Sequence, residues 1–355
     1  MISIKKFFHF SNLDKIRFRT VIYIAFFWTA IDFVIVLLRE DQQPHAKTLW
    51  FREVFIFSVS IIMGYLFVFR LKRMLRRFPL WFNFFTKSLI LLSAALLITF
   101  LLQFCSSIFI QKLDAYEAYH QIQSYALHKN WLLEKIIYWL IIFFITQLIL
   151  IINEKYSPGV FMDILVGKYI YPKIETRIVM FIDLKDSTPI AEKLGHSSYF
   201  EFIRDFIYRV SQAVIEFDGI IYQYVGDEVV CSWNFVPNNT RKCLDTVIQT
   251  RKNIQRKSVY FRNKYGIIPE FRVGIHLGEV TVGEIGVIKK DLAMSGDTMN
   301  TTARIRSACN ELNHQFIVSK TFVENINLET WQTESLGIVD LKGKGNGIEL
   351  FTLKI

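Results

Sequence analysis

Long runs of apolar residues dominate the first part of the chain, whereas shorter apolar runs separated by polar turns follow from about residue 153. A helix needs roughly 20 apolar residues, within a range of about 17–25, to cross a bilayer. A buried helix of a soluble protein would rarely be apolar on every face over this length. Four segments are apolar on every face and near this length: Thr20–Leu38, Val54–Phe69, Ser88–Ile110 and Ile136–Ile152. The pattern predicts an α-helical membrane domain with four transmembrane helices over residues 1–152.

Residues 177–355 alternate between strand patterns and helix patterns. An apolar strand at 177–183 leads into a helix that reaches about Phe217, and two apolar strands then meet at a tight turn. Further elements follow in order: a charged helix at 241–264, two strands in "EFRVGIHLGEVTVGEIGV", a helix from about Asp297, and two strands around the glycine-rich turn of the tail. Strands covered by helices in this order predict an α+β domain.

Residues 153–176 connect the two parts. Ser157, Pro158 and Gly159 interrupt any helix that continues from the membrane. Apolar residues then recur at helical spacing at 161, 164 and 165, which predicts a short amphipathic helix. This segment is either a coupling element between the two domains or a passive linker.

The net charge of +10 belongs to the membrane part. Residues 1–155 contain 18 Lys and Arg against 9 Asp and Glu, whereas residues 156–355 contain 24 against 23. The basic excess lies in the first 19 residues and at 70–87, and the loops at 39–53 and 111–135 are balanced. Basic loops stay in the cytoplasm, so both termini and the α+β domain are expected to be cytoplasmic. The charge flanks a membrane and does not indicate a nucleic-acid partner.

The first apolar segment is too long for a cleaved signal peptide and is expected to act as a signal anchor. The protein is therefore predicted to be a multi-pass protein of the cell's inner or plasma membrane. Asp32 lies near the middle of this segment, where an ionisable group is costly. It either serves signal reception or helix pairing, or it is a buried, hydrogen-bonded residue without a special function. The four cysteines have no paired metal-type spacing and are assigned no chemistry.

Two carboxylates end apolar strands in the second domain. The stretch "IVMFIDLKDST" runs from a strand into Asp183, and Asp227 lies in the turn between "GIIYQYVG" and "VVCSW". If these strands are neighbours, the two carboxylates point into one space and repel each other unless a cation lies between them. Hard oxygen ligands of this kind suit Mg²⁺ or Mn²⁺.

Five motifs resemble class III nucleotidyl cyclase catalytic domains in order and spacing: "FIDLKDST", "YVGDEVV", "FRVGIHLGEV", "SGDTMNTTARI" and "LKGKG". The resemblance covers about residues 175–355. It implies a ferredoxin-like βαββαβ core that forms a homodimer, with active sites between two catalytic domains. It also implies a nucleoside triphosphate substrate, which is converted to a 3′,5′-cyclic monophosphate and pyrophosphate with two Mg²⁺ or Mn²⁺ ions per active site.

The resemblance assigns roles to individual residues. The metal ligands are Asp183, Asp227 and the main chain of Leu184; the ribose and the pentavalent phosphorus are contacted by Asn300 and Arg304; the triphosphate contacts are Arg272, Lys342 and Thr188. Lys344 is the second choice for the role of Lys342. Ser187 stands where the family often carries an aromatic residue.

The positions that contact the purine base depart from the family pattern. Adenylate cyclases commonly carry Lys with Asp or Thr there, guanylate cyclases carry Glu with Cys, and this chain has Gln223 and Ala293. Glutamine both donates and accepts hydrogen bonds, so it suits either purine. ATP is favoured because the guanine-type Glu is absent, and guanylate cyclase activity remains the alternative.

Other classes of function remain open on the sequence. The domain could be a catalytically silent receptor or scaffold, although it retains both Asp residues, the Asn–Arg pair and the lysine. A transporter is disfavoured because the spans contain one central charge and no pair of interrupted helices. Diguanylate cyclases carry GG[DE]EF where this chain has "VGDEV".

Overall fold

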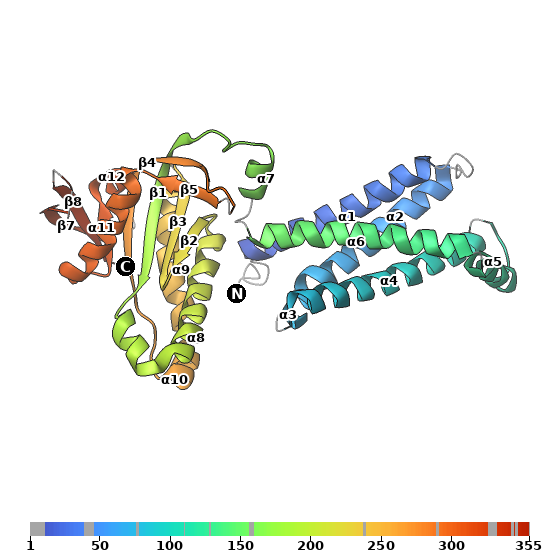
Figure 1. The fold of residues 1–355 in the computed structure, drawn as a ribbon, viewed down its shortest axis with the longest axis horizontal. Helices are drawn as coiled ribbons and strands as arrows, with labels where there is room; N and C mark the ends of the chain where they lie inside the picture. Colours follow the sequence, from blue (N-terminus) through green and yellow to red (C-terminus); the bar gives the residue numbers. More distant parts are fainter. Residues whose placement is uncertain are drawn as a thin grey trace, which may run out of the picture. The chain divides into compact units, whose positions relative to one another are not determined.

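The computed structural model describes residues 11–38, 46–75, 78–109, 111–127, 129–155, 160–236, 239–288, 291–325, 332–341, 344 and 347–354. The chain divides into two compact units (Figure 1). One comprises residues 14–155 and is called the membrane unit. The other comprises residues 156–355 with residues 1–13 and is called the catalytic unit.

All the regular secondary structure in the described residues of the membrane unit is helical. Its elements are α1 (Asn12–Leu38), α2 (Ala46–Tyr65), the π-helical turn η3 (Leu66–Leu71), α3 (Lys72–Leu75), α4 (Leu80–Phe109), α5 (Ala115–Leu127) and α6 (Lys129–Lys155). Four helical stretches of the described chain are long and apolar enough to cross a membrane: Asn12–Leu38, Leu49–Leu71, Leu80–Phe109 and Leu133–Ile152. They confirm the four helices predicted from the sequence.

Two segments that were assigned to loops are helical. Residues 46–53 form the first turns of α2, so Arg52 belongs to the second span instead of an exposed loop. Residues 115–127 form α5, which the sequence pattern did not predict. Arg52 donates from Nε and Nη2 to the two carboxylate oxygens of Asp32, at 2.8 Å each. Asp32 is 3% exposed, so it is a buried and ion-paired residue. Because its partner lies 20 residues away, local periodicity did not reveal the pair.

The catalytic unit contains one mixed sheet with the strand order β2-β3-β1-β4-β6-β8-β7, and β5 pairs with β4. Its strands are β1 (Lys173–Leu184), β2 (Ile220–Val225), β3 (Glu228–Asn234), β4 (Phe271–Ile285), β5 (Asp291–Ser295), β6 (Phe316–Ser319), β7 (Gln332–Val339) and β8 (Ile348–Lys354). Its helices are α7 (Val160–Leu165), α8 (Ser187–Glu216), α9 (Asn239–Gln255), α10 (Ser258–Tyr265), α11 (Asp297–Glu311) and α12 (Lys320–Val323). Along the chain, these elements follow the order β1-α8-β2-β3-α9-β4, and across the sheet the four strands lie in the order β2-β3-β1-β4. This is the predicted ferredoxin-like arrangement.

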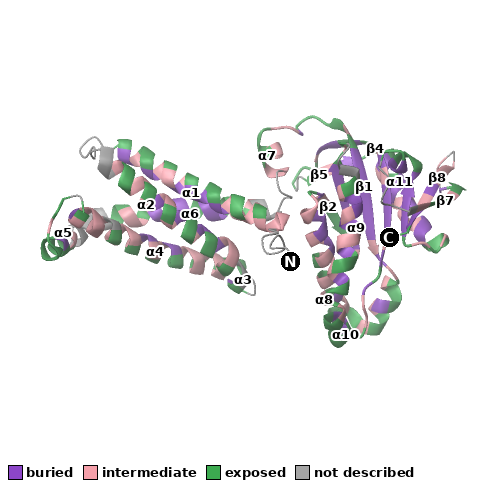
Figure 2. Ribbon diagram, turned by 180° about the vertical axis from the view of Figure 1, so that it is seen from behind, coloured by how far each residue is buried: buried purple, intermediate pink, exposed green. Residues whose placement is uncertain are grey.

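The central strand β1 has two different faces because successive side chains point to opposite sides of a sheet. Ile178, Met180 and Ile182 pack into the cluster that contains the apolar faces of α8 and α9. Val179 and Phe181 pack into the opposite cluster, which contains residues of β5 and α11. Figure 2 shows this strand buried between its neighbours. Asp183 continues the second series, so the alternation directs its side chain to the α11 side.

Some elements differ from the predicted pattern. The stretch predicted as two strands at 271–285 is a single strand, β4, because Gly278 and Gly283 do not form a turn. A Cβ at Gly278 would lie 2.4 Å from Thr298, and a Cβ at Gly283 would lie 3.3 Å from Pro172. These glycines allow other segments to pack closely against β4, as glycine within a strand often does. The helix predicted at 241–264 is divided into α9 and α10. The short elements β6 and α12 were not predicted.

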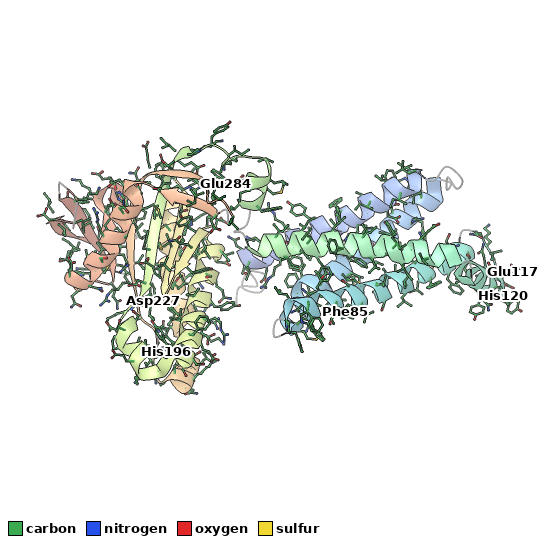
Figure 3. All side chains as sticks on the ribbon, in the orientation of Figure 1. Phe85, Glu117, His120, His196, Asp227 and Glu284 are labelled. Atoms are coloured by element: carbon green, nitrogen blue, oxygen red, sulfur yellow. The ribbon has the colours of Figure 1, made fainter. Side chains whose placement is uncertain are left out.

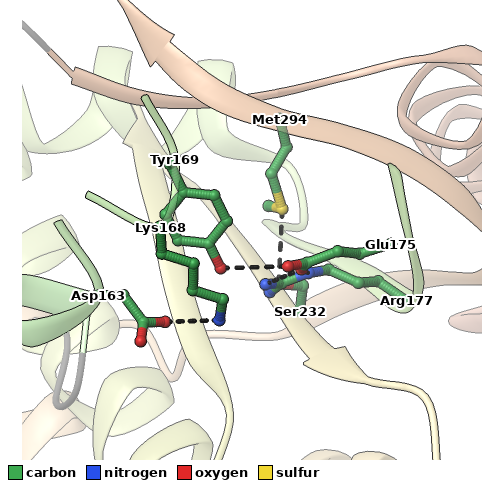
Figure 4. A network of polar contacts seen from close by, with 7 residues as sticks. All are labelled: Asp163, Lys168, Tyr169, Glu175, Arg177, Ser232 and Met294. Atoms are coloured by element: carbon green, nitrogen blue, oxygen red, sulfur yellow. Dashed lines mark hydrogen bonds and ion pairs between the residues drawn. The ribbon is translucent and has the colours of Figure 1, made fainter. Parts of the chain in front are cut away.

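The predicted amphipathic helix is present as α7, and the segment after it is fastened to the sheet (Figure 4). Lys168 forms an ion pair with Asp163 at 2.8 Å. The buried Tyr169 donates from its hydroxyl to Glu175 at 3.3 Å. Glu175 also pairs with the buried Arg177 at 2.6 Å, and Arg177 Nη1 donates to Ser232 Oγ of β3 at 3.1 Å. These contacts attach the segment after α7 to β1 and, through Arg177, to β3.

Candidate active site

The antiparallel pairing of β1 with β3 brings acidic residues together at one end of the sheet. Ile182 lies opposite Val229, so the next residues in each direction, Asp183 and Glu228, are neighbours on the α11 side. Asp227 precedes Glu228 in the turn after Gly226, which has a φ of 62° that favours glycine. Figure 3 labels Asp227 at this end of the unit. The predicted approach of two strand-end carboxylates is therefore present.

The environment of the two aspartates suits a bound cation. Burial raises the pKa of Asp183 above its usual value, and the negative charge of Asp227 raises it further, whereas Arg306 and Arg272 oppose this effect. Asp227 Oδ2 is buried and has no hydrogen-bond partner among the described residues. A buried carboxylate oxygen without a donor is costly, and a divalent cation would satisfy it.

Arg306 is a cation that sequence analysis did not predict at this site. Its Nη1 lies 3.5 Å from Asp183 Oδ2, and its Nε lies 2.7 Å from Glu228 Oε2. The second contact is an ion pair without hydrogen-bond geometry. Burial raises the pKa of Glu228, and the charge of Arg306 opposes this. Glu228 was also missed, although its position directly after Asp227, on the strand that pairs with β1, was the available signal.

Gly274 of β4 explains how α11 delivers Arg306 so close to the sheet. A Cβ at position 274 would lie 2.5 Å from the backbone nitrogen of Arg306, so a larger residue there would push the helix away. Only a strand residue without a side chain permits this approach.

Two of the residues expected to contact the triphosphate lie at the same end of the sheet as Leu184, whose main chain is expected to bind metal. Arg272 is the register partner of Asp183 on β4, and its Nη2 lies 3.9 Å from Asp186 Oδ1. Leu184 is the buried last residue of β1, and its backbone hydrogen bond to the Asp183 carboxylate lowers the pKa of that group. Thr188 is exposed in the first turn of α8, and the amide groups of a helix N-terminus commonly bind phosphate.

The lysines of the glycine-rich tail are only partly described. Lys342 lies outside the described residues. Lys344 lies within them and forms an ion pair with Asp297 at 2.6 Å. Asp297 begins α11, so this ion pair ties the tail to the N-terminus of the helix that carries Asn300.

Asn300 and Arg304 are not brought to the carboxylates of their own chain. They are four residues apart and share one face of α11. Arg306 is two residues further on, which is about 200° around the helix from Arg304. Since Arg306 faces Asp183, Asn300 and Arg304 face away from it. Asn300 is exposed, and neither side chain has a hydrogen bond or ion pair to the described part of the chain.

The two positions expected to contact the base lie on strands that are linked directly. Gln223 is exposed on β2 after a bulge, and Ala293 is half-buried on β5 opposite Gly283. The residues next to them are joined, because the backbone N–H of Met294 donates to the hydroxyl of Tyr222 at 3.0 Å. This bond brings β2 and β5 together across the α11 side of the sheet.

The donor set fits a hard divalent cation with an open coordination sphere. The described residues contain no group of three or more His, Cys, Asp or Glu side chains in metal-binding geometry. Asp183 and Asp227 would supply carboxylate oxygens, and the remaining positions would fall to water and phosphate. Mg²⁺ is commonly bound in this way, through one or two carboxylates and substrate phosphates.

Comparison with known proteins agrees with these features. The family model of the adenylate and guanylate cyclase catalytic domain matches residues 170–354. Adenylate cyclase 2 of Rhizobium meliloti (strain 1021) is 30% identical over 207 residues, which cover 58% of this chain and 57% of that protein. The adenylate cyclase of Anabaena cylindrica is 25% identical over 218 residues, which cover 57% and 42%, respectively. These alignments span less than two thirds of the length of each relative.

A solved structure of a bacterial light-regulated adenylyl cyclase has the same fold, with a TM-score of 0.53 and 18% identity over 64% of this chain and 67% of that one. The chain belongs to the adenylate and guanylate cyclase catalytic-domain family. Its catalytic unit is a class III nucleotidyl cyclase domain, and four long apolar helices precede it.

Proposed function

We propose that this protein is a membrane-bound nucleotidyl cyclase that converts ATP to 3′,5′-cyclic AMP and pyrophosphate. The observation that carries the proposal is the proximity of Asp183 and Asp227 at the end of β1 beside Arg272, with Asp227 Oδ2 buried without a donor among the described residues. The family membership and the two relatives named as adenylate cyclases support the same conclusion.

In the proposed reaction, the ribose 3′-oxygen bonds to the α-phosphorus, and the bond from this phosphorus to the β-phosphate bridging oxygen breaks. Pyrophosphate leaves, and the hydroxyl proton passes to water. Two divalent ions, held by Asp183 and Asp227 with the main chain of Leu184, would activate the hydroxyl and stabilise the leaving charge. Arg272 and the first turn of α8 at Thr188 hold the triphosphate, together with Lys342. Fixed cations are most effective where negative charge develops in a sheltered site.

The proposed active site requires two chains. Asn300 orients the ribose and Arg304 stabilises the charge on the pentavalent phosphorus. Their face of α11 is turned away from Asp183 of the same chain, and the exposed Asn300 is open to a partner. A homodimer then contains two equivalent sites, each with metal ligands from one catalytic unit and the Asn–Arg pair from the other. The membrane unit would favour this assembly by raising the local concentration of catalytic units.

The choice of purine depends on Gln223 and Ala293. Gln223 is exposed on β2, and β2 is joined to β5 through Tyr222 and Met294. A side chain at 223 that both donates and accepts would hydrogen-bond adenine, while Ala293 contributes only an apolar contact. Guanylate cyclase activity is the second candidate, because the same glutamine also matches the edge of guanine.

We further propose residues 1–152 as the membrane domain, 153–176 as the coupling segment and 177–355 as the catalytic domain. Both termini and the catalytic domain lie in the cytoplasm, where nucleoside triphosphates are available. The hydrogen bond from Tyr169 to Glu175 of β1, and the ion pair of Glu175 with Arg177, support coupling by the middle segment.

The deciding experiment is to incubate the purified full-length protein with Mn²⁺ or Mg²⁺ and each of the four nucleoside triphosphates and to identify the products by mass spectrometry. Cyclic AMP with an equal amount of pyrophosphate is the expected result. Cyclic GMP as the main product would establish the second candidate. No cyclic product from a folded, dimeric protein would instead indicate a silent domain that acts as a receptor or scaffold.

A further inference from the structure

The membrane unit contains a cavity of about 140 Å³ between α1, α2, α4 and α6. Asp32, near the C-terminal end of α1, and Arg52, near the N-terminal end of α2, both line it. The cavity therefore lies toward the end of the bundle that is remote from residues 14 and 155. A cavity of about 150 Å³ is large enough to hold a benzene ring, so this one suits a ligand with a body of that size.

The charged pair in the cavity leaves hydrogen-bond donors available. An arginine side chain has five N–H donors, and Asp32 engages Nε and Nη2 of Arg52. The Asp32 carboxylate already accepts these two hydrogen bonds, and the hydroxyl of Tyr138 also donates to it at 3.5 Å. The Asp32 side chain is 4% exposed, whereas that of Arg52 is 29% exposed. The accessible part of this ion pair is therefore its guanidinium side.

A second donor in the cavity wall has no acceptor. Trp139 is 8% exposed, and its Nε1 has no hydrogen-bond partner among the described residues. The neighbouring Trp28 shows the usual arrangement, because its Nε1 donates to Thr146 Oγ1 at 2.9 Å. A buried N–H group without a partner costs about 1–3 kcal/mol. Nε1 has almost no accessible surface, so an occupant with an acceptor oxygen would remove this cost once the indole turns its N–H edge toward the cavity.

The remaining wall is aromatic and aliphatic. The ring of Phe143 stacks on Trp139 with a centroid distance of 5.4 Å and meets Trp28 edge-on at 5.2 Å. Leu91 also lines the cavity and is 1% exposed. Sites between the helices of a bundle commonly combine such an apolar wall with a few polar groups that fix the orientation of a ligand.

We propose that this cavity is a binding site for a small carboxylic acid whose apolar body is about one ring in size. The carboxylate accepts hydrogen bonds from the free donors of Arg52 and from Trp139 Nε1, and the body packs against Trp28, Phe143 and Leu91. This site would be the sensory input of the membrane unit, and it stands independently of the reaction proposed for the catalytic unit. The neighbouring Glu53 does not line the cavity.

Binding is tested on the full-length protein in lipid nanodiscs by titration calorimetry with benzoate and phenylacetate as probes. Benzylamine and benzyl alcohol have the same ring without the carboxylate and serve as ligand controls. The expected result is saturable binding of at least one acid and no saturable binding of the amine or the alcohol.

Trp139→Phe removes the unpartnered N–H and keeps an aromatic ring, so the acid should bind about tenfold more weakly, as expected for one lost hydrogen bond to a charged group. Trp81→Phe is the matched control, because Trp81 is 71% exposed on α4 and does not line the cavity. It should bind the acid like the unmodified protein. Ala95→Leu fills part of the cavity, since Ala95 lines it and is 5% exposed, and should abolish binding in a protein that still folds by circular dichroism.

Three results would overturn the proposal. The first is that neither acid binds at millimolar concentration. The second is that both acids bind Trp139→Phe and Ala95→Leu as tightly as they bind Trp81→Phe, which would indicate partition into lipid. The third is that the amine binds more tightly than the acids. Since these measurements do not depend on cyclic nucleotide synthesis, their failure and the failure of the proposed enzymatic activity are distinguishable.

Discussion

Arg306 of α11 lies between two acidic strand ends, with Nη1 3.5 Å from Asp183 Oδ2 and Nε 2.7 Å from Glu228 Oε2. The chain thus supplies its own cation beside a carboxylate proposed to bind metal. Asp227 is the carboxylate it leaves unsatisfied. Charge balance at this end of the sheet is shared between a fixed guanidinium and the proposed divalent ions.

Arg306→Met should destabilise the metal-free protein. The methionine keeps much of the side-chain volume but leaves the partly buried Asp183 and Glu228 without a counter-charge. Loss of one partner of a buried ion pair costs about 3–5 kcal/mol, and partial exposure of this cluster should reduce the cost to about 1–3 kcal/mol. Thermal unfolding of the full-length protein in chelator measures the effect, and added Mn²⁺ should restore part of it.

Arg304→Met is the matched control for this experiment. It makes the same chemical change two residues away, on the face of α11 that is turned from the carboxylates. Equal unfolding temperatures for Arg304→Met and Arg306→Met in chelator would contradict the stabilising role of Arg306.

Asp183→Asn and Asp227→Asn should each reduce cyclic nucleotide synthesis by at least about 10³-fold while leaving the fold intact, because several kcal/mol of transition-state stabilisation depend on the metal ions. Asparagine retains the shape but removes the charge, and it relieves the repulsion between the two carboxylates. Binding of Mn²⁺ measured by electron paramagnetic resonance should weaken in both variants. Asp245→Asn, on α9, serves as the control. Near-normal turnover of either site variant at saturating Mn²⁺ would rule out the two-metal mechanism.

Base selection should follow positions 223 and 293. Gln223→Glu should shift the preference toward GTP, because its carboxylate accepts hydrogen bonds from the guanine edge. Gln223→Lys combined with Ala293→Asp should shift it toward ATP. Each well-placed contact should change the ratio of kcat/KM for the two nucleotides by about 1–3 kcal/mol. An unchanged ratio in all variants would mean that other residues bind the base.

Mixed dimers test the shared active site. Asp183→Ala and Asn300→Ala should each be inactive alone, because every site in either homodimer lacks one group. In a mixed dimer, one site carries both changes and the other carries neither. Coexpression should therefore restore up to half of the normal activity per mixed dimer. If the mixture stays inactive although copurification with two different tags demonstrates association, the shared site is wrong for this protein.

His276 should make the folded protein sensitive to mild acid. Burial lowers the pKa of His276 from 6.5 to about 4, and its Nδ1 is hydrogen-bonded to Ser319 Oγ at 2.8 Å. As the pH falls from 6.5 toward 4, the unfolded chain takes up a proton that the folded chain does not. The folded state therefore loses stability over this interval, by at most about 3 kcal/mol.

His276→Gln should remove this part of the pH dependence, since glutamine retains a hydrogen-bonding group but does not titrate. Thermal unfolding across the same pH interval measures it. His196→Gln is the control, because His196 is exposed on α8 (Figure 3). Parallel pH profiles for the unmodified protein and His276→Gln would show that this histidine is not responsible.

The sequence by itself determined the features that depend on local repetition. The length of the apolar runs predicted four helices, since a bilayer requires a minimum length whatever the packing. The alternation of residues along β1 and the turn at Gly226 are also local patterns, so the sequence predicted both of them. These two patterns located Asp183 and Asp227. The family motifs added Arg272, Asn300 and Arg304, although their roles remain proposals.

Only the tertiary structure decided which distant residues meet. Asp32 and Arg52 are 20 residues apart, and the sequence pattern assigned Arg52 to a loop. The packing of α1 against α2 brings the two side chains into contact. Gly274 and Arg306 approach each other because α11 packs closely on β4, and no periodic pattern in either segment records that approach. The physical reason is that periodicity determines which way a side chain points on its own element, whereas its partner depends on how the elements pack.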